Sequence, residues 1–406
     1  MKSVYEIESI ELFLVRAGWR DWIFVKILSL DGTIGWSECT ESNGSTEVLS
    51  SAIIMLSKDL IGLDCRNVKT LTHTMRLKVR QSLPGVLWKA ISALENALWD
   101  ISSKCQEQRI SEIVGMSALT VDSYEWPAYW SHCPTTRIRA SSLVSRPRVS
   151  SLDDLNGLVS EIKLNQFKAI KSNLLSFKDG PKIFMPGFSK TVGTLPFEIP
   201  DDYANELNQI LKYIEALSNN AFQVIVDLNY NVTPTLFKKL EPILHDAHVR
   251  WVEIDLDEIT AFNAITSSTT LPLCSGENLL TLWNYHKLLS NPAIQIISID
   301  LLWNGLTESL RIAQSAIQAG KKVTVHNYYG SFATSMALMF ASMLPTHSVE
   351  LFEFDFDDVP WRDDIVEKKP ILNAGNLVFQ NGLGWNNSLL IDEKNEYVIH
   401  HERVSR

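Results

Sequence analysis

The chain has 406 residues, a formal net charge of −10 and 45% hydrophobic residues. This length exceeds what one hydrophobic core usually supports, so we expect two domains. The acidic balance, without a cluster of Lys and Arg, argues against a nucleic-acid partner. The five cysteines are widely spaced and include no C-x-x-C pair, which predicts a reducing, cytoplasmic setting without a disulfide framework or a zinc site. The longest apolar stretch, 332–344, is too short to cross a bilayer of about 30 Å, so we expect a buried helix and no membrane partner.

The first part of the chain predicts an α+β domain over residues 1–125. Apolar runs at 9–15, 22–30 and 34–39 are separated by turn residues, which is typical of an antiparallel meander. Between Leu87 and Lys104 the apolar positions recur at steps of three and four, which predicts an amphipathic helix.

The second part, residues 126–370, predicts a (β/α)-barrel of the TIM type. Short, nearly continuous apolar runs alternate with helical stretches, and the last six runs begin 22 to 28 residues apart. This repeat favours a parallel sheet with helices outside, closed into a barrel. The expected strands are 126–132, 167–173, 224–229, 249–255, 271–278, 294–300, 321–327 and 349–355.

Two segments depart from the repeat. The second and third expected strands begin 57 residues apart, so residues 174–200 are predicted to be an insert above the barrel mouth. Such an insert is either a solvated excursion or a lid over the substrate, and the sequence leaves both open. The tail, 371–406, again resembles strand and turn, and we expect it to return to the first domain.

Acidic residues close three successive strands of the predicted barrel: Asp227, Glu253 and Glu277. Because the active site of a parallel barrel lies at the carboxyl ends of its strands, these side chains should meet at one rim. Each alone is more often a loop or helix-cap residue. Together they would repel one another and hold protons unless a hard dication bound them, and Mg²⁺ prefers such oxygen ligands. The sequence therefore predicts one magnesium site.

The next two strands end in Asp300 and His326. A lone His is more often structural. An Asp on the adjacent strand, however, can bond one imidazole nitrogen and raise the basicity of the other, which favours a general acid or base.

These residues resemble the mandelate racemase and muconate-lactonizing branch of the enolase superfamily. The helix around Ala90-Ile-Ser-Ala-Leu-Glu-Asn-Ala-Leu-Trp-Asp100, the strand Phe167-Lys-Ala-Ile-Lys171, and the intervals of 26 and 24 residues between the three acids carry the resemblance. It implies an α+β capping domain on a β₇α-type barrel, bound Mg²⁺, proton abstraction beside a carboxylate and, by habit of the family, a homo-oligomer.

The resemblance also implies roles for single residues. The three acids match the metal ligands, and His326 with Asp300 matches the His-Asp dyad of the mandelate racemase subgroup. Lys171 matches the first Lys of the family's Lys-x-Lys motif, which faces the substrate carboxylate. Glu353 matches a Glu that hydrogen-bonds that carboxylate, although a surface acid at a strand end remains an equal alternative.

One position departs from the family pattern. Asn173 replaces the second Lys, which is often the base opposite the His, and an amide cannot accept a proton at neutral pH. Asn173 and Asn229 are expected to face the substrate. Arg16, Trp19 and Arg20, in the first-domain loop, would suit a hydroxylated acid, but surface residues of a hairpin are at least as common.

A single base suits dehydration. His326 would remove the proton α to a carboxylate and return it to the departing β-hydroxyl, so the sequence predicts a Mg²⁺-dependent sugar-acid dehydratase that yields a 2-keto-3-deoxy acid. A racemase, epimerase or cycloisomerase that uses Lys171 or another group as second base is the alternative within the fold. The alternative of another functional class is a catalytically degenerate paralogue that binds acids or metal without turnover.

Overall fold

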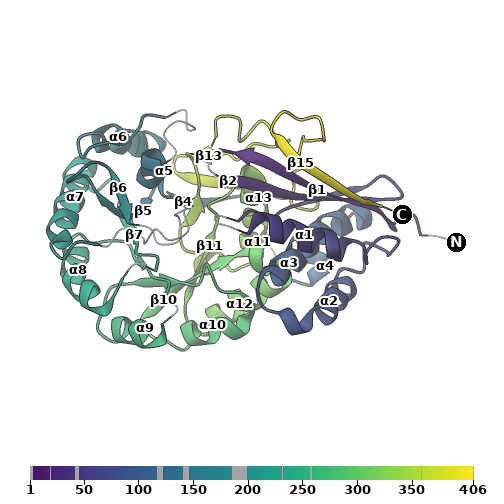
Figure 1. Ribbon diagram of the computed structural model, residues 1–406, viewed down its shortest axis with the longest axis horizontal. Coiled ribbons are helices and arrows are strands. Elements are labelled where there is room, and N and C mark those ends of the chain that lie inside the picture. The colour runs from purple at the N-terminus through teal and green to yellow at the C-terminus, as the bar shows by residue number, and fades with distance from the viewer. Residues whose placement is uncertain are drawn as a thin grey trace.

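The computed structural model describes residues 3–18, 20–41, 45–116, 122–139, 146–184, 199–230, 232–256, 258–357 and 359–405. These residues form a barrel of strands and helices with an α+β domain packed beside it (Figure 1).

The α+β domain is built on a four-stranded antiparallel sheet in the order β15-β1-β2-β3. Its first three strands follow one another in the chain, which confirms the predicted meander. The sheet contains β1 (Ile7–Ala17), β2 (Arg20–Ser29), β3 (Ile34–Glu38) and β15 (Val398–Ser405). Its helices are α1 (Thr46–Ser57), α2 (Val68–Lys78), α3 (Val86–Gln106) and α4 (Ile110–Val114), with the short 3₁₀ turn η1 (Arg80–Ser82).

Helix α3 joins the two parts of the molecule. Every residue from Ala90 to Ser103 is buried, as expected for a helix covered on all sides. On one side it lies against β3 so closely that a Cβ on Gly35 would meet Ala97 O at 2.6 Å. On the other side Asn96 donates to Leu301 O, at 3.3 Å, in the barrel.

Eight parallel strands form the barrel within the described residues. Each overlaps one of the eight predicted runs, and their apolar, β-branched sequences suit strands covered on both faces. Backbone ladders run from β11 through β10, β9, β8, β7 and β5 to β4, and β12 pairs with β4. Between β11 and β12 the link is one isolated bridge, Val323 to Val349. The strands are β4 (Ser123–Trp130), β5 (Ala169–Ser176), β7 (Gln223–Asp227), β8 (Val252–Glu253), β9 (Leu273–Ser275), β10 (Ile294–Asp300), β11 (Lys322–His326) and β12 (Phe352–Phe354).

Helices surround these strands (Figure 1). The helices are α5 (Cys133–Arg139), α6 (Leu155–Asn165), α7 (Tyr203–Ser218), α8 (Pro234–Asp246), α9 (Ile259–Thr266), α10 (Thr281–Leu289), α11 (Leu301–Asn304), α12 (Leu306–Gln318) and α13 (Ser331–Ser342), with the 3₁₀ turn η2 (Thr346–Ser348). Helix α13 is the buried helix predicted from the longest apolar run. No helix in the described ranges has the length and apolar character needed to span a bilayer.

The barrel interior is filled by its own small core. Its members come from successive strands or the residues beside them, as in the packed layers that fill parallel barrels. They are Tyr129, Ala169, Ile225, Trp251, Cys274, Ile296 and Leu351.

The tail contacts both parts of the molecule. Strands β13 (Leu372–Asn373) and β14 (Asn376–Gln380) form a hairpin whose second strand pairs antiparallel with β4 of the barrel. Trp385 then donates to Asn96 O of α3, at 3.1 Å, and β15 pairs with β1. The pairing with the barrel was not expected. The domain limits at 125 and 370 stay predictions.

The predicted insert begins as a hairpin. Strand β6 (Lys182–Phe184) folds back on the end of β5 in antiparallel register. A cavity of about 520 Å³ opens between this hairpin and α7, lined in part by Phe177 and Tyr203. None of the predicted site residues that the structure describes is among its lining residues. The remainder of the insert, 185–198, falls outside the described residues, so the choice between excursion and lid stays open.

Candidate active site

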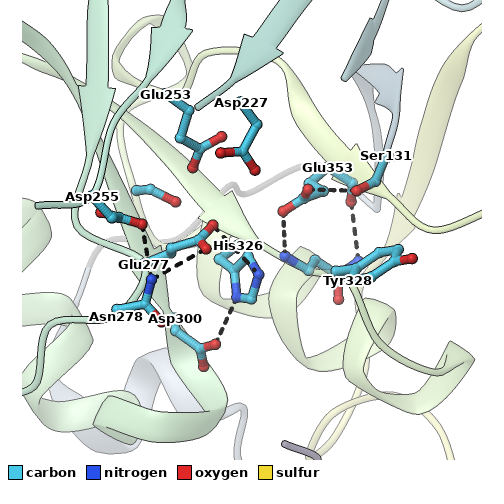
Figure 2. Close-up of polar contacts among 12 residues, drawn as sticks. Ser131, Asp227, Glu253, Asp255, Glu277, Asn278, Asp300, His326, Tyr328 and Glu353 are labelled. Atoms are coloured by element: carbon cyan, nitrogen blue, oxygen red, sulfur yellow. Dashed lines mark hydrogen bonds and ion pairs between the residues drawn. The ribbon is translucent and has the colours of Figure 1, made fainter. Parts of the chain in front are cut away.

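The three predicted metal ligands lie at the carboxyl ends of adjacent strands (Figure 2). Asp227 closes β7 and Glu253 closes β8, and the two residues are register partners in the parallel ladder. Glu277 follows β9, two residues past its end. The first two side chains are 2% exposed and that of Glu277 is 13% exposed, so all three acids have been taken largely out of water.

Lys171 supplies positive charge among these acids. Its ammonium lies 2.7 Å from Glu353 Oε1, 3.1 Å from Glu253 Oε2 and 3.8 Å from Glu277 Oε2. Its side chain is fully buried. Burial opposes the charge of Lys171, but the Glu253 and Glu353 carboxylates outweigh it and raise the pKa of the ammonium well above its usual value. The predicted site residues Lys171 and Glu353 therefore form a buried ion pair on β5 and β12.

One ammonium does not neutralise all of the acids. Burial raises the pKa of Glu253 to about 7, because the charge of Lys171 offsets that cost only partly and Asp227 adds repulsion. Burial and the charge of Glu253 raise the pKa of Glu277 well above its usual range. Glu353, also buried, is held at a pKa of about 2 because the charges of Lys171, His326 and His132 exceed the cost of desolvation. Glu253 and Glu277 are therefore the acids on which negative charge is least stable, and the ones that hold a proton most readily without a bound cation.

Asp227 is held at both of its oxygens. Oδ1 accepts hydrogen bonds from the backbone N and from Nδ2 of Asn229, each at 2.8 Å. Oδ2 lies 3.0 Å from Nε2 of His132, a buried residue just after β4. Burial opposes ionisation of Asp227, but the bond from His132 and the charge of Lys171 lower its pKa below the usual value. His132 was not among the predicted site residues, although it closes the expected strand 126–132 and the same strand-end position marked the acids.

Asn173 faces the site, as expected for a residue two positions from Lys171 on one strand. It is the register partner of Asp227. Its Nδ2 donates to Asn229 Oδ1 at 2.7 Å, and its Oδ1 accepts from Thr135 Oγ1 at 2.9 Å. The residue that replaces the second Lys therefore belongs to a hydrogen-bonded chain that ends on Asp227.

The predicted dyad is assembled on β10 and β11. Asp300 and His326 are register partners, and Nδ1 of His326 lies 2.7 Å from Asp300 Oδ2. Nε2 lies 3.6 Å from Glu277 Oε2, so the second nitrogen faces the carboxylates (Figure 2). Tyr329 donates its hydroxyl to the same oxygen of Asp300. Burial opposes protonation of His326, but the bond to Asp300 and the charges of Glu353 and Asp300 raise its pKa above the usual value.

The predicted substrate-binding residues of the first domain do not share one environment. The guanidinium of Arg20 is buried against Asp355 Oδ2, at 2.9 Å, and also donates to Tyr328 O, so it ties β2 to the loops that follow β11 and β12. Arg16 is exposed near the end of β1. Trp19 lies outside the described residues. The structure therefore brings Arg20 to the barrel mouth as a link between the two parts of the molecule, and leaves Arg16 at the surface.

The donor set fits a hard cation such as Mg²⁺. Within the described residues, Glu277 Oε2 is buried and accepts no hydrogen bond. A dication would also remove the mutual repulsion that keeps the pKa values of Glu253 and Glu277 high. No three acidic, imidazole or thiol groups in the described ranges already converge as a metal cage, and the Lys171 ammonium lies between the acids. Binding would therefore require the carboxylates to turn toward a common point.

Two family models match this sequence. The model described as "Mandelate racemase / muconate lactonizing enzyme, N-terminal domain" matches residues 14–115. The model described as "Enolase C-terminal domain-like" matches residues 158–391, more than half of the chain. The chain belongs to the enolase superfamily. The resemblance inferred from the sequence is thereby confirmed, in its mandelate racemase and muconate-lactonizing branch.

Relatives within the enolase superfamily are enzymes of more than one kind. The chain is 23% identical over 405 residues to D-xylonate dehydratase of Haloferax volcanii, covering 98% of this chain and 90% of the relative. It is 23% identical over 375 residues to D-galactarolactone cycloisomerase of Agrobacterium fabrum, covering 90% and 88%. These relatives confirm the expectation that the protein is an enzyme of the lyase or isomerase type.

A solved structure of the superfamily matches the whole architecture. A protein of Burkholderia xenovorans strain LB400, provisionally assigned as an L-alanine-DL-glutamate epimerase, superposes with a TM-score of 0.86 at 27% identity and covers 95% of this chain and 94% of its own. That protein was crystallised with magnesium and fumarate. Members of the superfamily generally bind Mg²⁺, which agrees with the donor set described above.

Proposed function

We propose that this enzyme dehydrates a sugar acid in a Mg²⁺-dependent reaction that uses His326 as its single base. The observation that carries the proposal is the pairing of an assembled His326–Asp300 dyad with an amide at position 173, the site of the second base in the family. In the family pattern for two-base enzymes, a Lys occupies the position of Asn173. In this protein the side chain of Asn173 is hydrogen-bonded to Asn229 instead.

Asp227, Glu253 and Glu277 would hold the ion. A magnesium ion there would stabilise the negative charge that develops on the substrate carboxylate as the α proton leaves. Lys171 lies beside these acids and can donate to the same substrate carboxylate. Glu353 keeps Lys171 charged and in place through their 2.7 Å contact.

His326 carries the proton in this scheme. In the neutral form of His326, Asp300 accepts from Nδ1–H, so Nε2 is the unprotonated nitrogen and it is directed toward the carboxylates. Nε2 takes the α proton, and the C–H electron pair forms a carbon–carbon double bond of the enediolate. Those electrons then expel the β-hydroxyl, which leaves as water with the same proton. The resulting enol becomes the 2-keto-3-deoxy acid, so the net change is loss of one water.

Epimerisation or cycloisomerisation is the second candidate, and the cycloisomerase and epimerase relatives favour it. It would require an acid or base on the face opposite His326. Lys171 is the candidate for this role, but its ammonium is held by Glu253 and Glu353, and its raised pKa keeps it protonated, so it is poorly suited to act as a base. We further expect the enzyme to act in the cytoplasm as a homo-oligomer, in keeping with the family.

The proposal is tested by incubating the protein with Mg²⁺ and a panel of sugar acids while 2-keto-3-deoxy product is measured. We expect product from at least one acid, loss of product with EDTA, and loss of product in His326→Asn. A variant of the exposed His286 on the outside of the barrel, His286→Asn, serves as the control and should retain activity. An epimer or a lactone rearrangement without keto product would overturn the dehydratase in favour of the second candidate.

A further inference from the structure

The two residues that hydrogen-bond to the carboxylate of Asp227, His132 and Asn229, both have a left-handed backbone conformation. His132 has φ of 46° and Asn229 has φ of 47°. Few non-glycine residues adopt this conformation, although His and Asn tolerate it better than most. Such residues persist where the surrounding structure holds them, and they cluster at functional sites. Here both of them place a nitrogen donor on the carboxylate of Asp227.

Hydrogen bonds from the described residues occupy three of the acceptor positions on Asp227. A carboxylate has about four acceptor positions, two on each oxygen. Oδ1 uses both of its positions on the N and Nδ2 of Asn229. Oδ2 uses one position on Nε2 of His132. The remaining position is therefore on Oδ2, and its direction depends on where His132 holds that oxygen.

The ring of His132 is itself fixed from several sides. Nδ1 lies 2.9 Å from Ser131 Oγ, and Ser131 donates to Glu353 Oε1 at 2.7 Å. The ring packs against that of Tyr328, with centroids 4.9 Å apart. The Tyr328 hydroxyl in turn lies 2.7 Å from Thr136 Oγ1. His132 is 6% exposed, so little water competes for these contacts.

We propose that His132 is a positioning residue for metal binding, which turns Oδ2 of Asp227 toward the cation. The inference rests on the proposed metal site. It differs from a catalytic role because both imidazole nitrogens are engaged, one with Ser131 and one with Asp227. Ser131 lies between His132 and Glu353, and its one hydroxyl hydrogen can be donated either to the acid on β12 or to Nδ1 of the neutral His132.

The test compares two variants of nearly equal size. His132→Gln keeps an N–H donor near the position of Nε2, whereas His132→Leu has none. Both put a residue with no special tolerance for positive φ at this position, so backbone strain is matched between them. The readout is the Kd for Mn²⁺, measured without substrate by electron paramagnetic resonance and confirmed by displacement with Mg²⁺. Thermal unfolding of the metal-free proteins checks that both variants fold.

Loss of a residue that orients a metal ligand typically weakens metal binding 10- to 100-fold. We expect a loss of about this size in His132→Leu and a loss of only a few-fold in His132→Gln. Equal affinities in wild type and His132→Leu, with binding still abolished by Glu277→Gln, would overturn the positioning role alone. Failure of the wild type to bind Mn²⁺ would overturn the proposed metal site, and this inference with it. Equal losses in the two variants would show that packing, not the donor, is what the site requires.

Discussion

Asp300 and His326 are direct neighbours across β10 and β11, and their side chains meet at 2.7 Å between Oδ2 and Nδ1. Parallel register places the two residues at the same height at the barrel mouth. The contact fixes which nitrogen of His326 faces the carboxylates, and it sets the pH range in which that nitrogen can act as a base.

Asp300→Asn should move the pH dependence of kcat/KM. Burial opposes protonation of His326, but the Asp300 contact and nearby negative charge raise its pKa above the usual value of 6.5. A base must be unprotonated, so activity should rise with pH along an acid limb that lies above 6.5. Removing the charge of Asp300 should shift this limb to lower pH and reduce kcat by about 10²-fold or more. An acid limb that stays in place would exclude His326 as the group that titrates.

Asn173→Lys tests why the site has one base. A Lys at this position would face the substrate from the strand that also carries Lys171, where the family has its second base. We expect the variant to form some epimer of the substrate at the α carbon, detected by proton NMR, with slower dehydration because the bond to Asn229 is lost. Asn173→Met has similar length and no amine, and serves as the control. If neither variant forms epimer, the result would contradict the assignment of position 173 to the second-base side of the substrate.

Lys171→Met should destabilise the metal-free protein. The variant leaves Glu353 and Glu253 buried without their shared cation, and breaking a buried ion pair typically costs about 3–5 kcal/mol. We expect a matching fall in the free energy of unfolding in urea at pH 7 with EDTA present. The exposed Lys168 lies on the approach to the same strand, and Lys168→Met should change stability by less than about 0.5 kcal/mol. Similar effects at the two positions would show that the ion pair contributes little.

Gly330→Ala tests the contact between the two parts of the molecule. Glu38, at the end of β3, accepts from the backbone N of Gly330 at 3.2 Å and of Ala333 at 2.9 Å, at the start of α13. A Cβ on Gly330 would lie 3.1 Å from Glu38 Oε2. We expect a loss of about 1–3 kcal/mol in thermal or urea unfolding.

Gly157→Ala is the matched control for that variant. Gly157 lies in α6, and its added Cβ would meet nothing within 4 Å. Alanine has the higher helix propensity, so this variant should gain about 0.5–1 kcal/mol. A gain in unfolding free energy at both positions would mean that the Glu38 side chain moves aside at little cost, and that its contact with α13 contributes little to stability.

The barrel strands and their acidic ends could be predicted because they depend on local sequence. A strand buried on both faces reads as an apolar run, and in a barrel the residue that closes it lies at the site. The positions of Asp227, Glu253, Asp300 and His326 at the ends of neighbouring strands were predicted in this way.

Other features are contacts between residues far apart in the chain, and a local pattern does not show which residues will meet. The bond from His132 to Asp227 spans 95 residues, and the ion pair of Arg20 with Asp355 spans 335. The expected role of Arg20 in substrate binding rested on its loop position alone, and the structure places its guanidinium against Asp355. The pairing of β14 with β4 was missed for the same reason.

The most direct test of the central claim is the fate of the α carbon in D₂O. A sugar acid that yields keto product with Mg²⁺ is allowed to react partway, and the remaining acid and the product are analysed by NMR. We expect 2-keto-3-deoxy product, while the remaining acid keeps its configuration at the α carbon whether or not it has taken up deuterium. Remaining acid with inverted configuration would contradict the single-base mechanism and show that a second group acts opposite His326.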